Sequence, residues 1–204
     1  MKSRILFTAM TLVAALAIAS AKSQAGPVEV SVLGGVQTLN QNDTALPDQM
    51  SNVPAIASVA YHFNSNLAAE GEFSWLIPVQ QKVDLGSGVT QELKTPDVLA
   101  YQANVRLSWP LLNWTPYVAG GAGAVTFLSN TDANRMPQLT ESQTAFAINF
   151  GAGATFRLAE RWAVRADVRE LAAFPSNDAQ GLSSSGSSDA IWMERGALGL
   201  AYRF

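Results

Sequence analysis

The sequence contains no cysteine and only one histidine, His62, among its 204 residues. The lack of cysteine excludes a disulfide framework and any thiolate metal site. A single histidine also excludes a metal site built from several imidazoles, and we expect no cofactor. Charged residues make up 14% of the chain, well below the roughly 25% of an average globular protein. At this length a single domain is the natural expectation.

Beyond its first 25 residues the chain has no long apolar run, which argues against membrane-spanning helices. Residues 1–25 have the parts of a secretory signal: a basic start, an apolar centre over 5–19, and small residues before candidate cleavage sites at Ala21 and Ala25. We predict that this segment is removed and that residues 26–204 form one domain. Removal takes away Lys2, Arg4 and Lys22, which leaves 13 − 3 = 10 basic against 16 acidic residues. This acidic balance argues against nucleic acid as a partner.

Alternation of apolar and polar residues, the period of a β-strand, recurs eight times in the remaining chain. The clearest case is the fourth segment, where Tyr101, Val105 and Leu107 alternate with Gln102 and Arg106. The seventh segment loses this parity at Glu170, where we expect a tilted strand to leave the hydrocarbon. The predicted strands are 28–39, 54–63, 67–79, 98–109, 116–127, 144–158, one that begins at 162, and 191–204.

The connections between these strands alternate strictly between short and long. Residues 64–66, 110–115 and 159–161 form short turns, whereas 40–53, 80–97, 129–143 and 175–190 form long polar loops without predicted structure. All long loops therefore lie on one side of the sheet, as in outer-membrane barrels with short periplasmic turns. A sheet in lipid must close, because an open edge leaves backbone groups unpaired. The predicted fold class is all-β, an eight-stranded antiparallel up-and-down transmembrane β-barrel.

Aromatic residues gather at both ends of the predicted strands. We expect them to form two belts at the membrane interfaces, which a soluble lipocalin-like barrel with an inward apolar face would not need. The belt beside the short turns comprises Tyr61, Phe63, Trp109, Trp114, Tyr117, Phe156, Trp162, Tyr202 and Phe204, and the belt beside the long loops comprises Trp75, Phe127, Phe146, Phe174 and Trp192.

The last strand carries a family resemblance. Gly199, Tyr202 and Phe204 match the glycine-x-x-aromatic-x-aromatic ending that the outer-membrane insertion machinery reads, although Ala197 stands where that family usually has a polar residue. With its glycine-rich stretches at 117–124 and 151–155, the chain after the signal resembles the OmpA-like, opacity-type family of small outer-membrane barrels. The resemblance implies a monomer whose partners are the lipid bilayer, lipopolysaccharide and the insertion machinery. We expect no periplasmic peptidoglycan-binding domain after the last strand.

Charged residues occupy the predicted inner face of several strands. In the narrow lumen of an eight-stranded barrel these charges must pair, because an isolated buried ion costs several kcal/mol. We predict a lumen charge network formed by Glu70, Glu72, Arg106, Arg157, Arg165, Asp167 and Arg169.

These features predict a structural, surface-interaction protein of the bacterial outer membrane, with a charge-plugged lumen and long external loops that contact a host or surface ligand. One alternative is a narrow gated pore for ions or small solutes. Another is a lipid A-modifying enzyme, but His62 lies beside a short turn and should face the periplasm, away from the outer leaflet. We therefore expect no enzymatic activity.

Overall fold

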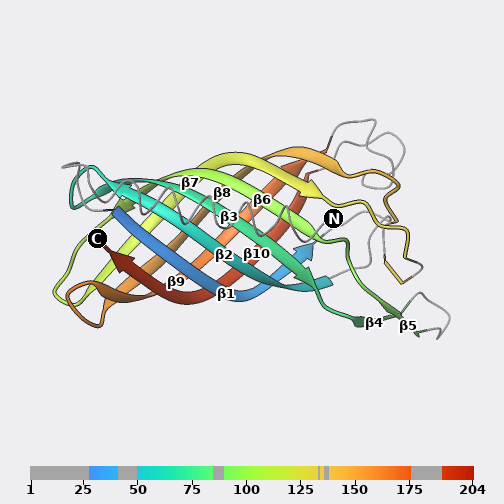
Figure 1. Ribbon diagram of the computed structural model, residues 1–204, viewed down its shortest axis with the longest axis horizontal. Coiled ribbons are helices and arrows are strands. Elements are labelled where there is room, and N and C mark those ends of the chain that lie inside the picture. Colours follow the sequence, from blue (N-terminus) through green and yellow to red (C-terminus); the bar gives the residue numbers. More distant parts are fainter. Residues whose placement is uncertain (1–27, 41–49, 85–89, 133, 136–137, 176–189) are drawn as a thin grey trace.

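Eight strands close into an antiparallel β-barrel in the computed structural model, which describes residues 28–40, 50–84, 90–132, 134–135, 138–175 and 190–204 (Figure 1). The predicted fold class is confirmed. The predicted signal segment lies outside the described residues. Among the described residues no helix is long and apolar enough to span a membrane. In their order around the barrel the strands are β1 (Val28–Asn40), β10 (Ile191–Arg203), β9 (Trp162–Phe174), β8 (Gln143–Arg157), β7 (Trp114–Phe127), β6 (Val98–Ser108), β3 (Leu67–Pro78) and β2 (Met50–His62).

The pairing register fixes the tilt of the strands. A row of paired residues starts at Val28 and returns to β1 at Thr38, so the barrel has a shear of 38 − 28 = 10 residues. With about 3.3 Å per residue and 4.8 Å between strands, this shear on eight strands gives a tilt of about 40°. Each step along the row then rises by about 3 Å along the barrel axis. The row passes through Tyr61, Ala69, Val105, Gly120, Phe150, Glu170 and Glu194.

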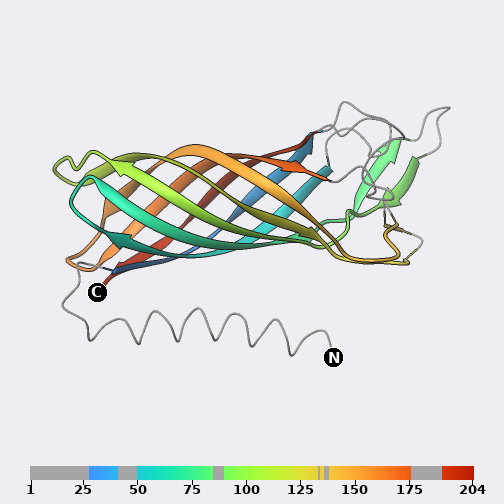
Figure 2. The ribbon, with the colours of Figure 1, turned by 90° about the horizontal axis from the view of Figure 1, so that it is seen from above.

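Short turns lie at one end of the barrel, beside the C-terminus, and long connections lie at the other (Figures 1 and 2). The prediction of an unstructured loop over 80–97 is wrong in part. This segment contains a hairpin of β4 (Gln81–Asp84) and β5 (Thr90–Leu93), which extends beyond the barrel end in Figure 2. β2 also begins at Met50, four residues before the predicted start at Pro54. Both differences have the same cause. Strands that pair beyond the membrane-spanning part of the barrel need no alternation of apolar and polar residues, so the sequence pattern does not indicate them.

Burial alternates along β9 up to Glu170 and stops alternating directly after it, where Leu171, Ala172 and Ala173 are all buried, although the strand itself continues to Phe174. Arg165, Asp167 and Arg169 are buried in the lumen, and Ala166 and Val168 between them are exposed on the outer face. Glu170 therefore faces outward within an unbroken strand. In the sequence, Glu170 interrupts the apolar row of the outer face. Leu171 and Ala173, which follow it on the inner face, are apolar in turn.

Two residues assigned to the aromatic belts lie inside the barrel instead. Tyr117 and Phe127 are buried on the inner face of β7, at 2% and 1% exposure. The other belt residues, such as Phe63, Trp109, Phe146 and Trp192, lie on the outer face. Glycines at alternate positions made the parity of β7 unreadable from the sequence, since a strand interrupted by glycine has no clear apolar face.

Glycines on the inner face of the barrel allow neighbouring strands to approach closely. At Gly123 an added Cβ would overlap the carbonyl oxygen of Tyr101 on β6, whereas at Gly71 on the outer face it would meet nothing. The same division holds throughout the described strands. The crowded inner positions are Gly35, Gly121, Gly123, Gly151, Gly153 and Gly199, and the open outer ones are Gly34, Gly71, Gly120 and Gly196.

Candidate functional site

The lumen is filled by charged side chains over the half of the barrel nearer the short turns. Glu70 of β3 lies at the centre, fully buried, and forms ion pairs with three arginines from two other strands, β6 and β9. Its carboxylate oxygens lie 3.3 Å from Arg106, 2.6 Å from Arg165 and 3.3 Å from Arg169. The antiparallel register brings these groups together across the barrel, although they are separated by up to 99 residues in sequence.

Two further carboxylates bridge the same arginines to Arg195 of β10. Glu72 lies 3.1 Å from Arg169 and 2.8 Å from Arg195. Asp167 lies 3.0 Å from Arg169 and 3.2 Å from Arg195. Arg195 was not included in the predicted network, and these contacts make it a member.

Glu29 forms the end of the network nearest the short turns. One carboxylate oxygen lies 2.8 Å from Arg106, and the other lies 3.3 Å from His62 and 3.4 Å from Arg203. Nε2 of His62 also lies 2.9 Å from Arg106. The only histidine of the chain is thus held among charged groups at this end of the barrel.

Tyr117 links the network to β7. Its hydroxyl donates to Asp167 at 2.8 Å and accepts from Nε of Arg165 at 2.8 Å. The guanidinium groups of Arg106 and Arg165 lie 5.2 and 5.1 Å from the centre of the Tyr117 ring, within the range of cation–π attraction. No charge pattern in the sequence could have assigned this role to a tyrosine.

Buried charges of the two signs balance. Four carboxylates (Glu29, Glu70, Glu72 and Asp167) face four buried arginines (Arg106, Arg165, Arg169 and Arg195), while the side chain of Arg203 is 46% exposed at the rim. Taking ions out of water costs several kcal/mol each, and close opposite charges with shared hydrogen bonds offset that cost. The arrangement therefore holds charge in a space with little room for water.

Arg157 is the one residue of the predicted network that lies elsewhere. Its side chain is exposed at the end of β8, and it contributes to the rim of a cavity at the short-turn end. The other six predicted residues are buried in the lumen. Inner parity alone selected Arg157, but the last residue of a strand extends beyond the packed interior, where water solvates its charge.

Above the charged half, an apolar cluster occupies the lumen beside a few buried polar side chains such as Ser74 and Asn52. Leu76, Val98, Val125, Phe127 and Met193 are fully buried there and pack into one cluster together with residues of β1, β8, β9 and β10. Leu139, which belongs to the connection between β7 and β8, inserts into the same cluster at 1% exposure. The lumen is thus blocked by two successive layers, one ionic and one hydrophobic.

The connections at the long-loop end close over this apolar layer. Arg135 lies 3.0 Å from Asp97 and donates to the backbone carbonyl of Thr95 at 3.1 Å. The buried hydroxyl of Thr95 donates to Asn52 on the inner face of β2 at 2.7 Å. These contacts tie the segment after β5 and the β7–β8 connection to each other and to the barrel wall.

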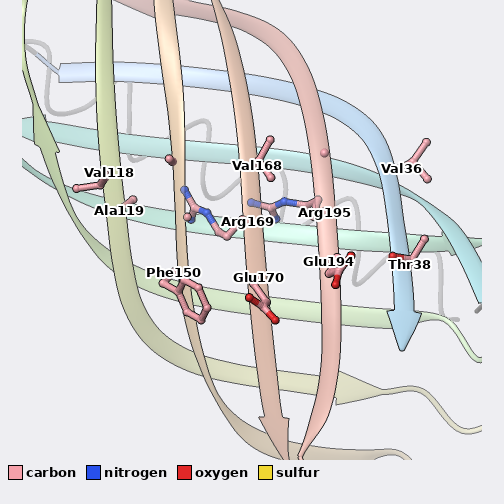
Figure 3. A pocket seen from close by; sticks show the side chains of 13 residues that line it. Val36, Thr38, Val118, Ala119, Phe150, Val168, Arg169, Glu170, Glu194 and Arg195 are labelled. Atoms are coloured by element: carbon pink, nitrogen blue, oxygen red, sulfur yellow. The ribbon is translucent and has the colours of Figure 1, made fainter. Parts of the chain in front are cut away.

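A groove of about 880 Å³ crosses the outer face of the barrel (Figure 3). Outward side chains such as Val36, Phe150 and Val168 border it, and Gly196 leaves it open. Glu170 and Glu194 lie at one end, directly opposite each other on β9 and β10. Glu170 is the sixth step and Glu194 the seventh step along the row of paired residues that starts at Val28. At about 3 Å of rise per step, they lie about 18 and 21 Å above the short-turn end. These two carboxylates therefore lie in the half of the outer face that is nearer the long connections.

The residues of the predicted insertion signal lie at the end of β10. Gly199 faces inward, where a Cβ would overlap the carbonyl oxygen of Val32 on β1. Tyr202 makes edge-to-face contacts with Trp162 and Phe204, each at 4.9 Å between ring centres. Gly199 therefore has a packing role in the folded barrel, and recognition by the insertion machinery stays a prediction.

Among the described residues, no group of three or more histidines and carboxylates has an arrangement that could hold a metal ion. The three central carboxylates of the lumen are instead occupied by arginines.

Comparison with known proteins identifies the family. The family model described as outer membrane protein beta-barrel domain matches residues 6–204. Among curated proteins no sequence match is found. Several solved structures share the fold at low sequence identity, and the alignments span almost the whole length of those proteins.

The N-terminal β-barrel domain of OprF from Pseudomonas aeruginosa is 13% identical, with 88% of this chain and 98% of that chain covered and a TM-score of 0.54. Ail, the attachment invasion locus protein of Yersinia pestis, solved in complex with the heparin analogue sucrose octasulfate, is 15% identical, with 89% and 100% covered and a TM-score of 0.53. Neisserial surface protein A is 9% identical, with 88% and 99% covered and a TM-score of 0.58. The chain belongs to the outer membrane protein beta-barrel domain family, and it lies in the bacterial outer membrane.

Proposed function

We propose that the protein is a closed, non-conducting outer-membrane barrel that presents its long external loops to a surface or host ligand. The observation that carries the proposal is the double block of the lumen, with ion pairs around Glu70 below and the apolar cluster with Leu139 above. An ion entering this lumen would have to displace buried charge pairs and then cross the apolar cluster. Both steps are costly, because each requires charge in a low-dielectric space.

The barrel wall supports an interaction role for a single chain. All eight strands pair within one molecule, so the described sheet offers no open edge to a second copy, which is consistent with a monomer. The parts that vary in a barrel of this type are the external loops, and here one loop is extended by the β4–β5 hairpin.

The charge of the loops indicates which ligands they favour. The predicted loops contain nine acidic residues (Asp43, Asp48, Asp84, Glu92, Asp97, Asp132, Glu141, Asp178 and Asp189) and three basic ones (Lys82, Lys94 and Arg135), a net charge of 3 − 9 = −6. Ail was solved with a sulfated sugar, but a surface of this sign repels polyanions. We propose a cationic ligand, such as a basic peptide segment, for this chain.

Conductance in planar bilayers tests the closed barrel. The wild-type protein should give no steady channels, whereas a narrow pore would give reproducible conductance that changes with salt. Binding of polylysine and of a heparin fragment to the barrel in nanodiscs tests the ligand class. Polylysine should bind, and Asp132→Asn with Glu141→Gln should weaken it. Preferential binding of heparin would contradict the assignment.

A further inference from the structure

The short-turn end of the barrel contains a cavity of about 470 Å³ that opens beside the ion-pair network. In barrels of this type the short turns face the periplasm. Ends of strands and all three short turns line the cavity, and arginines outnumber glutamates among its charged residues. Four arginines (Arg106, Arg157, Arg161 and Arg203) accompany two glutamates (Glu29 and Glu160) and His62.

The acidic group at the base of the cavity is already neutralised. Glu29 is held by Arg106, His62 and Arg203 at 2.8 to 3.4 Å. Arg106 is only 2% exposed, and its Nε has no hydrogen-bond partner. A buried N–H donor without an acceptor costs free energy, so an acceptor that enters the cavity and bonds to Nε of Arg106 would remove that cost.

Within the part of the chain that the structure describes, the arginines nearer the opening form no ion pair, although Glu160, next to Arg161 in the chain, lines the same cavity. Among the described residues, no carboxylate lies within ion-pair distance of Arg157 or Arg161. Arg161 donates only to the hydroxyl of Tyr202, at 3.3 Å. Ser108, Thr115 and Thr155 add hydroxyl groups to the same wall. Guanidinium groups with hydroxyl donors beside them are typical of sites that bind phosphate or carboxylate oxygens.

We propose that this periplasmic mouth is a binding site for a phosphate-type oxyanion, in which Arg157 and Arg161 provide the contact charge and the ion pair of Arg106 with Glu29 forms the floor. The phosphate can be a free periplasmic solute or the headgroup of an inner-leaflet lipid. The second source is within reach because Trp162, next to Arg161, belongs to the aromatic belt at this interface. The site lies at the opposite end from the loops and is independent of their ligand.

Titration calorimetry of the full barrel in dodecyl maltoside micelles, with inorganic phosphate as the probe, tests the site. Wild-type protein should bind one phosphate saturably. Arg157→Gln/Arg161→Gln should weaken binding by about tenfold or more, because two charge-assisted hydrogen-bond donors are lost. Lys82→Gln/Lys94→Gln removes the same charge at the external end and should leave the affinity unchanged. Heat-modifiable migration on a denaturing gel verifies that each variant is folded.

The same titration in phosphatidylglycerol nanodiscs separates the two sources. A lower apparent phosphate affinity than in micelles, with a phospholipid retained by wild type but not by the arginine variant in native mass spectrometry, indicates a lipid headgroup. Equal affinity in both media indicates a free solute. Absence of saturable binding in micelles, or an equal loss in the lysine control, would overturn the proposal.

Discussion

Glu72 illustrates how much a single lumen residue contributes. It forms an ion pair with Arg169 and accepts a hydrogen bond from Arg195, and both arginines are buried. Glu72→Ala leaves these guanidinium groups short of one counter-charge, and we expect a loss of about 3–5 kcal/mol in the free energy of unfolding. Urea unfolding from lipid vesicles measures this loss, with Glu141→Ala in an exposed connection as the control. A loss below about 1 kcal/mol, with steady conductance in bilayers, would mean that the lumen is hydrated and screened.

Glu170 and Glu194 give the opposite expectation on the outer face. Like charges directly opposite on neighbouring strands repel each other, and lipid around them increases the cost. Glu194→Gln should therefore stabilise the barrel by about 0.2–1 kcal/mol in the same unfolding assay. Glu141→Gln should have no effect. Destabilisation by Glu194→Gln would show that the pair makes a favourable contact with another component of the membrane.

At the scale of the strand, the glycines of the inner face set how closely neighbours approach. Gly123→Ala should destabilise the β6–β7 pair by about 1–3 kcal/mol, because the new Cβ overlaps the carbonyl of Tyr101. Gly71→Ala is the matched control, since its Cβ meets open space on the outer face. It should be neutral or stabilising by up to about 1 kcal/mol. Equal effects at the two sites, measured by unfolding from vesicles, would contradict the close approach.

At the scale of the whole molecule, the alternation of short and long connections predicts which sites an external protease reaches. Lys82, Lys94 and Arg135 lie beyond the long-loop end, and Arg161 lies in a short turn. Trypsin added to intact cells should cut after the first three residues only. Cleavage after Arg161 should require a permeabilised outer membrane. Cleavage at Arg161 in intact cells would reverse the orientation of the barrel.

The sequence by itself determined the number of barrel strands, their antiparallel order and the outer face of most of them. The reason is that side chains of a strand alternate with a period of two, so burial is encoded locally. In the β6 segment, for example, Val105 and Leu107 are exposed on the outer face and Arg106 is buried between them. Lipid strengthens this pattern, because a charged residue on the outer face is penalised.

Only the tertiary structure decided which charges meet, because that depends on closure and register across the whole barrel. Glu70 meets arginines from β6 and β9 because of the shear of ten residues. The same closure puts Tyr117 inside and leaves Arg157 at the rim. The closing layer around Leu139 comes from a polar loop, whose burial has no period for a sequence to reveal. Local alternation sets the face of each residue, and non-local geometry sets its partner.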